Sequence, residues 1–403
     1  MTEIDLEDPK PFPNNETMAL GKQIESLNSS YDSTFWEDYT IILPEQDFGT
    51  IARSIDQKNQ SHNHKEEIEH RINRYAKQKD IRVDSILSFY NRKGLFNGNA
   101  LVTYEGELIF EKSYNNDLTK NHENSQFRIG STSKTFTAML VMLLEAQSKL
   151  QLSDPVSKFL PDYKHGKATI KQLLTHQSGI PDYLNDGFHL DELYAKAYTT
   201  DELISRFCSD TLEFAHGQQF DYSNSGYVLL AGIIEKVTDK PFGQVLQEMI
   251  FEPLGMTDSY FGTSANNKNL SKGYLFNQPE PNFPVLNTIG AGGITTTTQD
   301  LLKWSRALDN ASLVSNDLIK ELWEPRAAYL DWDAYYGYGW MIDQAQFGVT
   351  KKHQIVYHPG TDNGFNSMFL KQPDKGITII LLNNTGAFPR FDITDLILAE
   401  LDR

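Results

Sequence analysis

The 403-residue chain contains a single cysteine, Cys208. One cysteine excludes an intrachain disulfide and a zinc site built from several thiolates. This cysteine usage fits a cytosolic protein, and equally an exported protein that is large enough to be stable without disulfides. No apolar run approaches the roughly 18–20 residues that a transmembrane helix requires, so we expect no membrane span.

The chain is also poor in positive charge. It carries 37 Lys and Arg against 54 Asp and Glu, which gives a formal net charge of -17 at pH 7. A nucleic-acid-binding surface requires clustered Lys and Arg, and anionic lipid attracts the same kind of cluster. We therefore expect no nucleic-acid partner.

The start of the chain lacks the pattern of a targeting signal. Its first residues, MTEIDLEDPKPFPNNETM, are acidic, whereas a signal peptide has a basic segment followed by an apolar one. The protein is exported to the periplasm or the exterior if such a signal has been removed, and cytoplasmic otherwise. Residues 1–75 form an N-terminal extension of unknown role. We interpret its three histidines, His62, His64 and His70, as solvated residues rather than metal ligands.

Strand patterns occur at both ends of the remaining chain, with helical patterns between them. The segment GNALVTYEGELIFEKSY has two β-rich runs on either side of Glu105-Gly106, which predicts a hairpin. Residues from 131 to about 260 have mostly helical apolar spacing. Strand patterns return after about residue 335, before a final amphipathic helix. The order predicts an α/β (α+β) fold, with a discontinuous α/β domain (76–130 and 290–403) and a mainly helical domain (131–289).

The segment FRIGSTSKTF contains the only S-x-x-K sequence of the chain, formed by Ser131 and Lys134 at the start of a strongly apolar helix. Residues three apart share a helix face, so the lysine can reach the serine hydroxyl. Burial lowers the pKa of a lysine, and a helix N-terminus offers N–H groups where an oxyanion would form. The pair is therefore a candidate nucleophile and base. The alternative is an ordinary helix start, because serine is a favoured N-cap residue.

Other hydrolase and nucleotide motifs are missing from the sequence, including G-x-S-x-G, H-E-x-x-H, the P-loop and G-x-G-x-x-G. The S-x-x-K segment resembles that of the serine β-lactamase and penicillin-binding-protein superfamily. FRIGSTSKTFTAML is most similar to the branch containing class C β-lactamases, D-alanyl-D-alanine carboxypeptidases and related esterases. The resemblance implies a β-lactamase-like fold, in which an antiparallel sheet flanked by helices is interrupted by a mainly helical domain.

This branch has a Tyr-x-Asn second element, and the chain contains three copies of that sequence, beginning at Tyr114, Tyr183 and Tyr222. The first copy precedes the serine, which is the wrong order for the family. The second follows LLTHQSGIPD, a segment similar to a family loop between the two elements. The third, in FDYSNSGYVLLAGIIE, stands at a helix entrance and resembles the family segment closely. We select Tyr222 with Asn224; an N-cap role for Asn224 could coexist with catalysis.

The third element of the family is Lys-x-Gly or His-x-Gly. His358-Pro359-Gly360 follows a strand pattern in YHPGTDNGFNSMF, whereas Lys164-His165-Gly166 precedes the tyrosine element and is interpreted as a turn. Four further segments resemble the family: LLTHQSGIP (173–181), FEPLGMTDSYF (251–261), GAGGITTTTQDLLKW (290–304) and YGYGW (336–340). The resemblance covers about residues 80–395.

The resemblance also implies a role for each residue of the site. Ser131 attacks an acyl carbonyl and forms an acyl-enzyme, while Lys134 and Tyr222 share the proton transfers. Asn224 positions the lysine and the substrate. The backbone N–H groups of Ser131 and Thr361 hold the oxyanion, and His358, Gly360 and Thr361 contribute to substrate binding. No metal or organic cofactor is required.

The substrate class depends on His358. The family's Lys-x-Gly lysine presents a cation to a substrate carboxylate, whereas a histidine with an ordinary pKa is mostly neutral at pH 7. We therefore expect a serine hydrolase of a small-molecule or peptide ester or amide, either an esterase or a D-amino-acid-specific peptidase or carboxypeptidase. A true class C-type β-lactamase is one alternative. A non-catalytic, penicillin-sensor-like binding protein is another, although the intact Ser–Lys–Tyr set argues against it.

Overall fold

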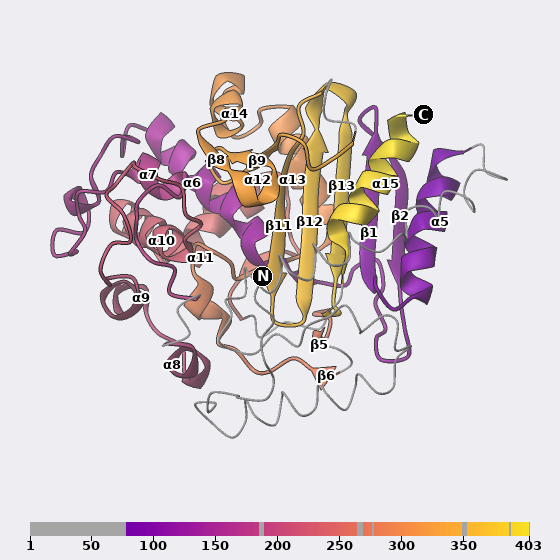
Figure 1. The fold of residues 1–403 in the computed structure, drawn as a ribbon, viewed down its shortest axis with the longest axis horizontal. Coiled ribbons are helices and arrows are strands. Elements are labelled where there is room, and N and C mark those ends of the chain that lie inside the picture. Colours follow the sequence, from indigo (N-terminus) through magenta and orange to yellow (C-terminus); the bar gives the residue numbers. More distant parts are fainter. Residues whose placement is uncertain are drawn as a thin grey trace.

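The computed structural model describes residues 78–402, except 185–188, 264–268, 276–277, 349–352 and 387. The N-terminal extension (1–75), with its three histidines, lies outside the described residues. An eight-stranded antiparallel sheet in the order β2-β1-β13-β12-β11-β10-β9-β8 organises the described part (Figure 1). Its strands are β1 (Gly98–Tyr104), β2 (Glu107–Tyr114), β8 (Ala327–Tyr329), β9 (Ala334–Tyr336), β10 (Met341–Asp343), β11 (Val356–Asp362), β12 (Phe365–Gln372) and β13 (Ile377–Asn383).

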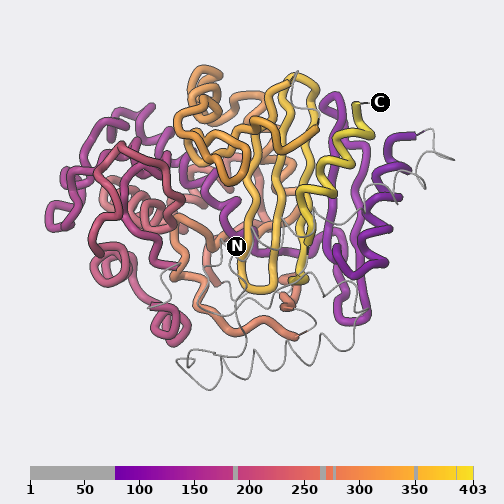
Figure 2. The backbone as a smooth tube through the Cα atoms, viewed as in Figure 1, coloured from indigo at the N-terminus to yellow at the C-terminus, as the bar shows by residue number. Residues whose placement is uncertain are grey.

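The predicted hairpin at the start of this sheet is confirmed. Glu105 and Gly106 connect β1 to β2, and both have positive φ, 52° and 81°. Two consecutive left-handed residues form the tight turn whose twist matches that of the flanking strands. On its other side β1 pairs with β13, so strands from the two ends of the described chain lie next to each other, as Figure 2 shows.

The central strands are buried on both faces, and alternate residues pack against different layers. Val102 and Ile379 belong to a core with α5 (Lys79–Arg92) and α15 (Arg390–Asp402). Leu101 and Ile380 belong to the larger core, which includes α13 (Thr298–Asp309) and the helical part of the chain. The two-residue period of a strand explains the division. The sheet is therefore covered by helices on both faces, which agrees with the predicted β-lactamase-like fold (Figure 1).

The helical part of the chain lies to one side of the sheet (Figure 2). Its helix with the longest buried run is α6 (Lys134–Ala146), whose residues from Lys134 to Leu144 are all buried because the sequence is apolar nearly throughout. The other helices of the described chain are α7 (Ile170–Leu174), α8 (Leu190–Ala195), α9 (Thr200–Phe207), α10 (Asn224–Thr238), α11 (Phe242–Leu246), α12 (Glu252–Leu254) and α14 (Asn316–Leu322). The division of the chain into domains stays a prediction.

Shorter elements connect these layers. The small strands are β3 (Phe127–Arg128), β4 (Tyr260–Phe261), β5 (Tyr274–Leu275), β6 (Gln278–Pro279) and β7 (Ile294–Thr296). The 3₁₀ turns span Gly130–Ser133, Val156–Lys158, Val285–Thr288, Leu330–Trp332 and Pro373–Lys375, and a π-helical turn spans Gln247–Phe251. Within the described ranges, no helix combines the length and the apolar character needed to cross a bilayer.

Candidate active site

Ser131 lies in the 3₁₀ turn between β3 and α6, next to strand β11. The turn is fixed to the sheet by Thr132, whose hydroxyl donates to the carbonyl of His358 at 3.0 Å and shares a hydrogen bond with Ser367 Oγ at 2.9 Å. Gly360 permits the close approach of β11, because a Cβ atom there would lie 1.9 Å from the carbonyl oxygen of Ile129. The serine is thus held at the junction of the sheet and the buried helix α6.

Lys134 directs its amine into this junction from the first turn of α6. Its Nζ atom lies 3.1 Å from Ser131 Oγ, 2.7 Å from Asn224 Oδ1 and 2.9 Å from the carbonyl oxygen of Ala291. The side chain is fully buried, and burial lowers its pKa to about 7, against the opposing effect of the Asp182 carboxylate. A neutral amine is therefore accessible near pH 7, and its lone pair can accept the serine proton.

Tyr222 lies in irregular backbone two residues before α10 begins, at the predicted helix entrance. Its ring centroid is 4.9 Å from Lys134 Nζ. Burial raises the pKa of Tyr222 well above 10, and a hydrogen bond with Ser131 opposes this rise. The phenol is therefore protonated at neutral pH and lies within reach of the candidate nucleophile.

The two competing tyrosines lie elsewhere. The Tyr183 hydroxyl donates to the carbonyl of Asn287, and its ring is buried in the larger core. The Tyr114 hydroxyl donates to Asp84 Oδ1 at 2.6 Å, on strand β2. Asn185, which completes the Tyr183 copy, lies outside the described residues. Of the three copies, the structure brings Tyr222 to the serine.

Asn224 connects the lysine to the carboxylate of Asp182, which was not among the predicted site residues. Its Oδ1 accepts from Lys134, and its Nδ2 donates to Asp182 Oδ2 at 2.7 Å. Burial raises the pKa of Asp182, and the nearby Lys134 opposes this rise. Asp182 is the last residue of LLTHQSGIPD, the segment that resembles a family loop, and this resemblance could have indicated that Asp182 lies near the site. The helix cap is formed by Ser223, whose Oγ accepts from Gly226 N, so the N-cap interpretation of Asn224 was wrong.

His358, on β11, has both ring nitrogens engaged. Nδ1–H donates to the carbonyl of Pro359 at 2.6 Å, and Nε2 accepts from the Tyr336 hydroxyl at 2.9 Å. Burial, together with the positive charge of Lys134, lowers the pKa of His358 to about 3. The imidazole is therefore neutral at pH 7, as expected. Lys164, the rejected alternative, contacts the carbonyl of Ser209 and does not line the pocket.

Thr361 follows on the same strand and is held by a residue at the start of α15. Arg390, in α15, donates to Thr361 Oγ1 at 2.8 Å and to the carbonyl of Gly360 at 2.7 Å. The Thr361 backbone lies against Gly130, because a Cβ atom at Gly130 would be 2.7 Å from Thr361 N. The backbones that carry the two expected oxyanion donors are therefore in contact. No motif in the sequence indicated Arg390.

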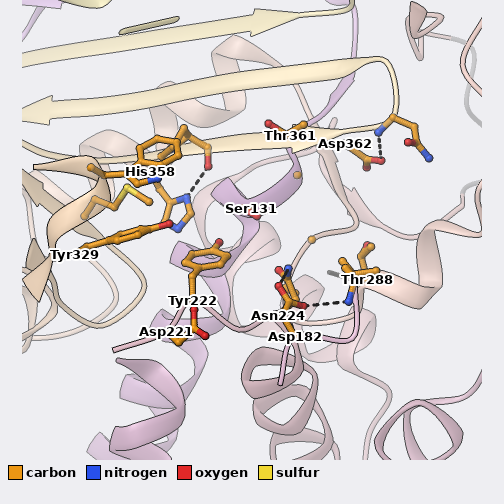
Figure 3. A pocket seen from close by; sticks show the side chains of 18 of the residues that line it. Ser131, Asp182, Asp221, Tyr222, Asn224, Thr288, Tyr329, His358, Thr361 and Asp362 are labelled. Atoms are coloured by element: carbon orange, nitrogen blue, oxygen red, sulfur yellow. Dashed lines mark hydrogen bonds between the residues drawn. The ribbon is translucent and has the colours of Figure 1, made fainter. Parts of the chain in front are cut away.

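The side chains surround one pocket of about 330 Å³ (Figure 3). Ser131, Tyr222, Asn224 and His358 all line it, with Asp182 beside Asn224. Its other carboxylate side chains are Glu213, Asp221 and Asp362, and its aromatic side chains are Phe283, Tyr222, Tyr329 and Trp332. Among the described residues, no group of three or more His, Cys, Asp or Glu side chains is arranged to hold a metal ion.

A sheet flanked by helices, with a serine–lysine pair at its junction with a buried helix, defines a serine hydrolase of the β-lactamase-related class. The chain belongs to the beta-lactamase family, whose model matches residues 83–402. It is 28% identical to penicillin-binding protein 4* of Bacillus subtilis over 345 residues, which cover 79% of this chain and 74% of the relative.

Solved structures agree with the fold. A penicillin-binding protein homologue from Pyrococcus abyssi, described as octameric, matches with a TM-score of 0.69 and 26% identity, over 79% of this chain and 76% of that one. The D-amino acid amidase from Ochrobactrum anthropi SV3, in complex with L-phenylalanine, matches with a TM-score of 0.71 and 22% identity. That match covers 79% of this chain and 97% of the amidase.

Proposed function

We propose that the protein hydrolyses an ester or amide through an acyl-enzyme on Ser131. The observation that carries the proposal is the buried Lys134 amine, 3.1 Å from Ser131 Oγ and 2.7 Å from Asn224 Oδ1. A lysine desolvated to a pKa of about 7 is a suitable general base at neutral pH, whereas an exposed lysine is not. An ordinary helix start, the alternative interpretation of Ser131 and Lys134, would not require the lysine amine to be buried beside the serine.

In the first step Ser131 Oγ attacks the acyl carbonyl carbon, and its proton passes to the Lys134 amine. The oxyanion is held by the backbone N–H groups of Ser131 and Thr361. Tyr222 then donates its phenolic proton to the leaving alcohol or amine and recovers a proton from Lys134. In the second step water attacks the acyl carbonyl carbon and gives a proton to the Lys134 amine. The bond between the acyl carbon and Ser131 Oγ then breaks, and Lys134 returns that proton to Ser131 Oγ. Asn224 holds the lysine in place throughout.

The electrostatics of the pocket support an ester or amide without an essential carboxylate. His358 is neutral, with both nitrogens engaged, and the Thr361 hydroxyl donates to Asn366 Oδ1 at 3.2 Å. Asp182, Glu213, Asp221 and Asp362 line the same pocket. Burial raises the pKa of Asp182 and of Glu213 to about 7, and Asp362 pairs with Arg128 at 3.0 Å. The lining still has more acidic side chains than basic ones, of which Arg390 is one, and this is compatible with the amine of an aminoacyl substrate. An esterase or D-amino-acid-specific peptidase or amidase therefore fits better than a β-lactamase.

The test is covalent labelling by a fluorophosphonate, read by intact mass. The wild type should gain one adduct, while Ser131→Ala should gain none and keep the same thermal midpoint. Ser133→Ala is the matched control, because that serine lies two residues away and does not line the pocket. An unlabelled wild type would support the non-catalytic alternative, and a labelled Ser131→Ala protein would refute the assignment of the nucleophile.

A further inference from the structure

His176 has a backbone conformation that ordinarily suits glycine. It follows α7 in the segment LLTHQSGIP, and its φ is +55°, in the left-handed region. A side chain with a Cβ atom is uncommon there, although histidine is tolerated better than bulky or β-branched residues. A strained backbone at a residue with a large side chain calls for a compensating use of that side chain.

The hydrogen bonds of His176 enclose Tyr222. The carbonyl oxygen of His176 accepts from the N–H of Asp221 at 2.9 Å, and its Nδ1 accepts from the N–H of Ser223 at 3.0 Å. These are the residues immediately before and after the tyrosine. The three residues 221–223 lie outside helix and strand, so neither a helix nor a strand fixes the backbone at this point.

The imidazole ring also supports the tyrosine ring. The two centroids are 4.2 Å apart with an interplanar angle of 29°, a stacked arrangement. The imidazole in turn meets Tyr336 in a T-shaped contact with centroids 4.5 Å apart. His176 is 1% exposed and lies outside the set of residues that line the pocket, so a substrate in the pocket contacts Tyr222 and not His176.

We propose that His176 is a positioning residue that holds the backbone and ring of Tyr222 where its phenol can serve Ser131. The proposal rests on the proposed function, because it assigns His176 a role through a catalytic Tyr222. Displacing a catalytic group by about 1 Å can cost about 10²-fold in rate. The neutral imidazole is required, since a protonated Nδ1 could not accept from Ser223, and burial holds the pKa of His176 well below 6.5.

The first experiment compares rates of inactivation by a fluorophosphonate in three variants. His176→Phe keeps an aromatic ring but loses the acceptor for Ser223, and should react about 10- to 100-fold more slowly than the wild type. His176→Asn keeps an acceptor and tolerates the left-handed backbone, so its inactivation rate should lie between those of the wild type and His176→Phe. Tyr163→Phe is the stability control, because it removes a buried hydrogen bond to the carbonyl of Cys208 and should react at the wild-type rate.

The second experiment separates positioning from a general structural effect. If His176 acts through Tyr222, the double variant His176→Phe/Tyr222→Phe should react no more slowly than Tyr222→Phe alone. Independent effects that multiply would overturn the proposal, as would a His176→Phe rate equal to that of Tyr163→Phe. If the Phe variant does not fold, the same comparison is made with His176→Asn. A wild type that the probe never labels would instead overturn the proposed function.

Discussion

Lys134 and Asp182 are connected through a single side-chain amide. Asn224 accepts a hydrogen bond from the lysine at 2.7 Å and donates one to the carboxylate at 2.7 Å. These two partners fix the orientation of the Asn224 amide, with its oxygen toward the amine and its nitrogen toward the carboxylate. Burial lowers the pKa of the Lys134 amine and raises the pKa of the Asp182 carboxyl group, and the charge of each group opposes the shift of the other.

This arrangement predicts the pH dependence of acylation. The reactive form needs a neutral Lys134, and burial lowers the pKa of that lysine to about 7. The acylation rate should therefore rise with pH and level off above about 7, as the amine loses its proton. In Asp182→Asn the carboxylate that raises the lysine pKa is gone, so the inflection should move down by about one pH unit. Second-order inactivation rates across the pH range test both statements, and an inflection that moves upward would contradict the assigned coupling.

Tyr222→Phe should lower the acylation rate by about 10²- to 10⁴-fold, because it removes the proton donor to the leaving group. The contrasting variant is Tyr183→Phe, which removes the hydrogen bond to the carbonyl of Asn287. It should cost stability of about 1 kcal/mol and leave the rate unchanged. Aryl-ester burst kinetics and thermal melts measure the two effects. A large rate loss in the Tyr183 variant would reassign the second element.

Gly360→Ala should impair both stability and acylation. The added methyl group would lie 1.9 Å from the Ile129 carbonyl oxygen, so β11 must move away from the serine turn and take Thr361 with it. Overpacking of this kind costs about 1–3 kcal/mol. Gly348→Ala is the matched control, since its Cβ would meet Asp395 Oδ1 at an ordinary 3.5 Å. The prediction fails if the two variants melt and react alike.

Substrate preference should follow the neutral His358. An aryl acetate should have a kcat/KM at least about tenfold above that of a chromogenic cephalosporin. The neutral His358 offers no cationic donor to the carboxylate of the cephalosporin, so the enzyme lacks a charge-assisted hydrogen bond there that would be worth about 1.5–3 kcal/mol. Steady-state hydrolysis of both substrates by the same preparation gives the ratio. Cephalosporin hydrolysis near the diffusional ceiling would restore the β-lactamase alternative.

Local sequence determined a large part of the site. Ser131 and Lys134 are three residues apart on a helical segment, so their proximity follows from helix geometry. The apolar run after them predicted the burial on which the lowered lysine pKa depends. Residue types likewise indicated the hairpin at Glu105-Gly106, whereas the resemblance to the family selected Tyr222 among the three copies.

Only the tertiary structure decided the remaining contacts, because they join residues that are remote in sequence. Asp182 reaches Asn224 across 42 positions, and Arg390 reaches Thr361 across 29. His176 forms hydrogen bonds to Asp221 and Ser223 with its own backbone in the left-handed region, and no local propensity indicates that conformation. The apolar periodicity of a sequence indicates which face of a helix or strand is buried. Which residues that face contacts depends on how the sheet and the helices pack together.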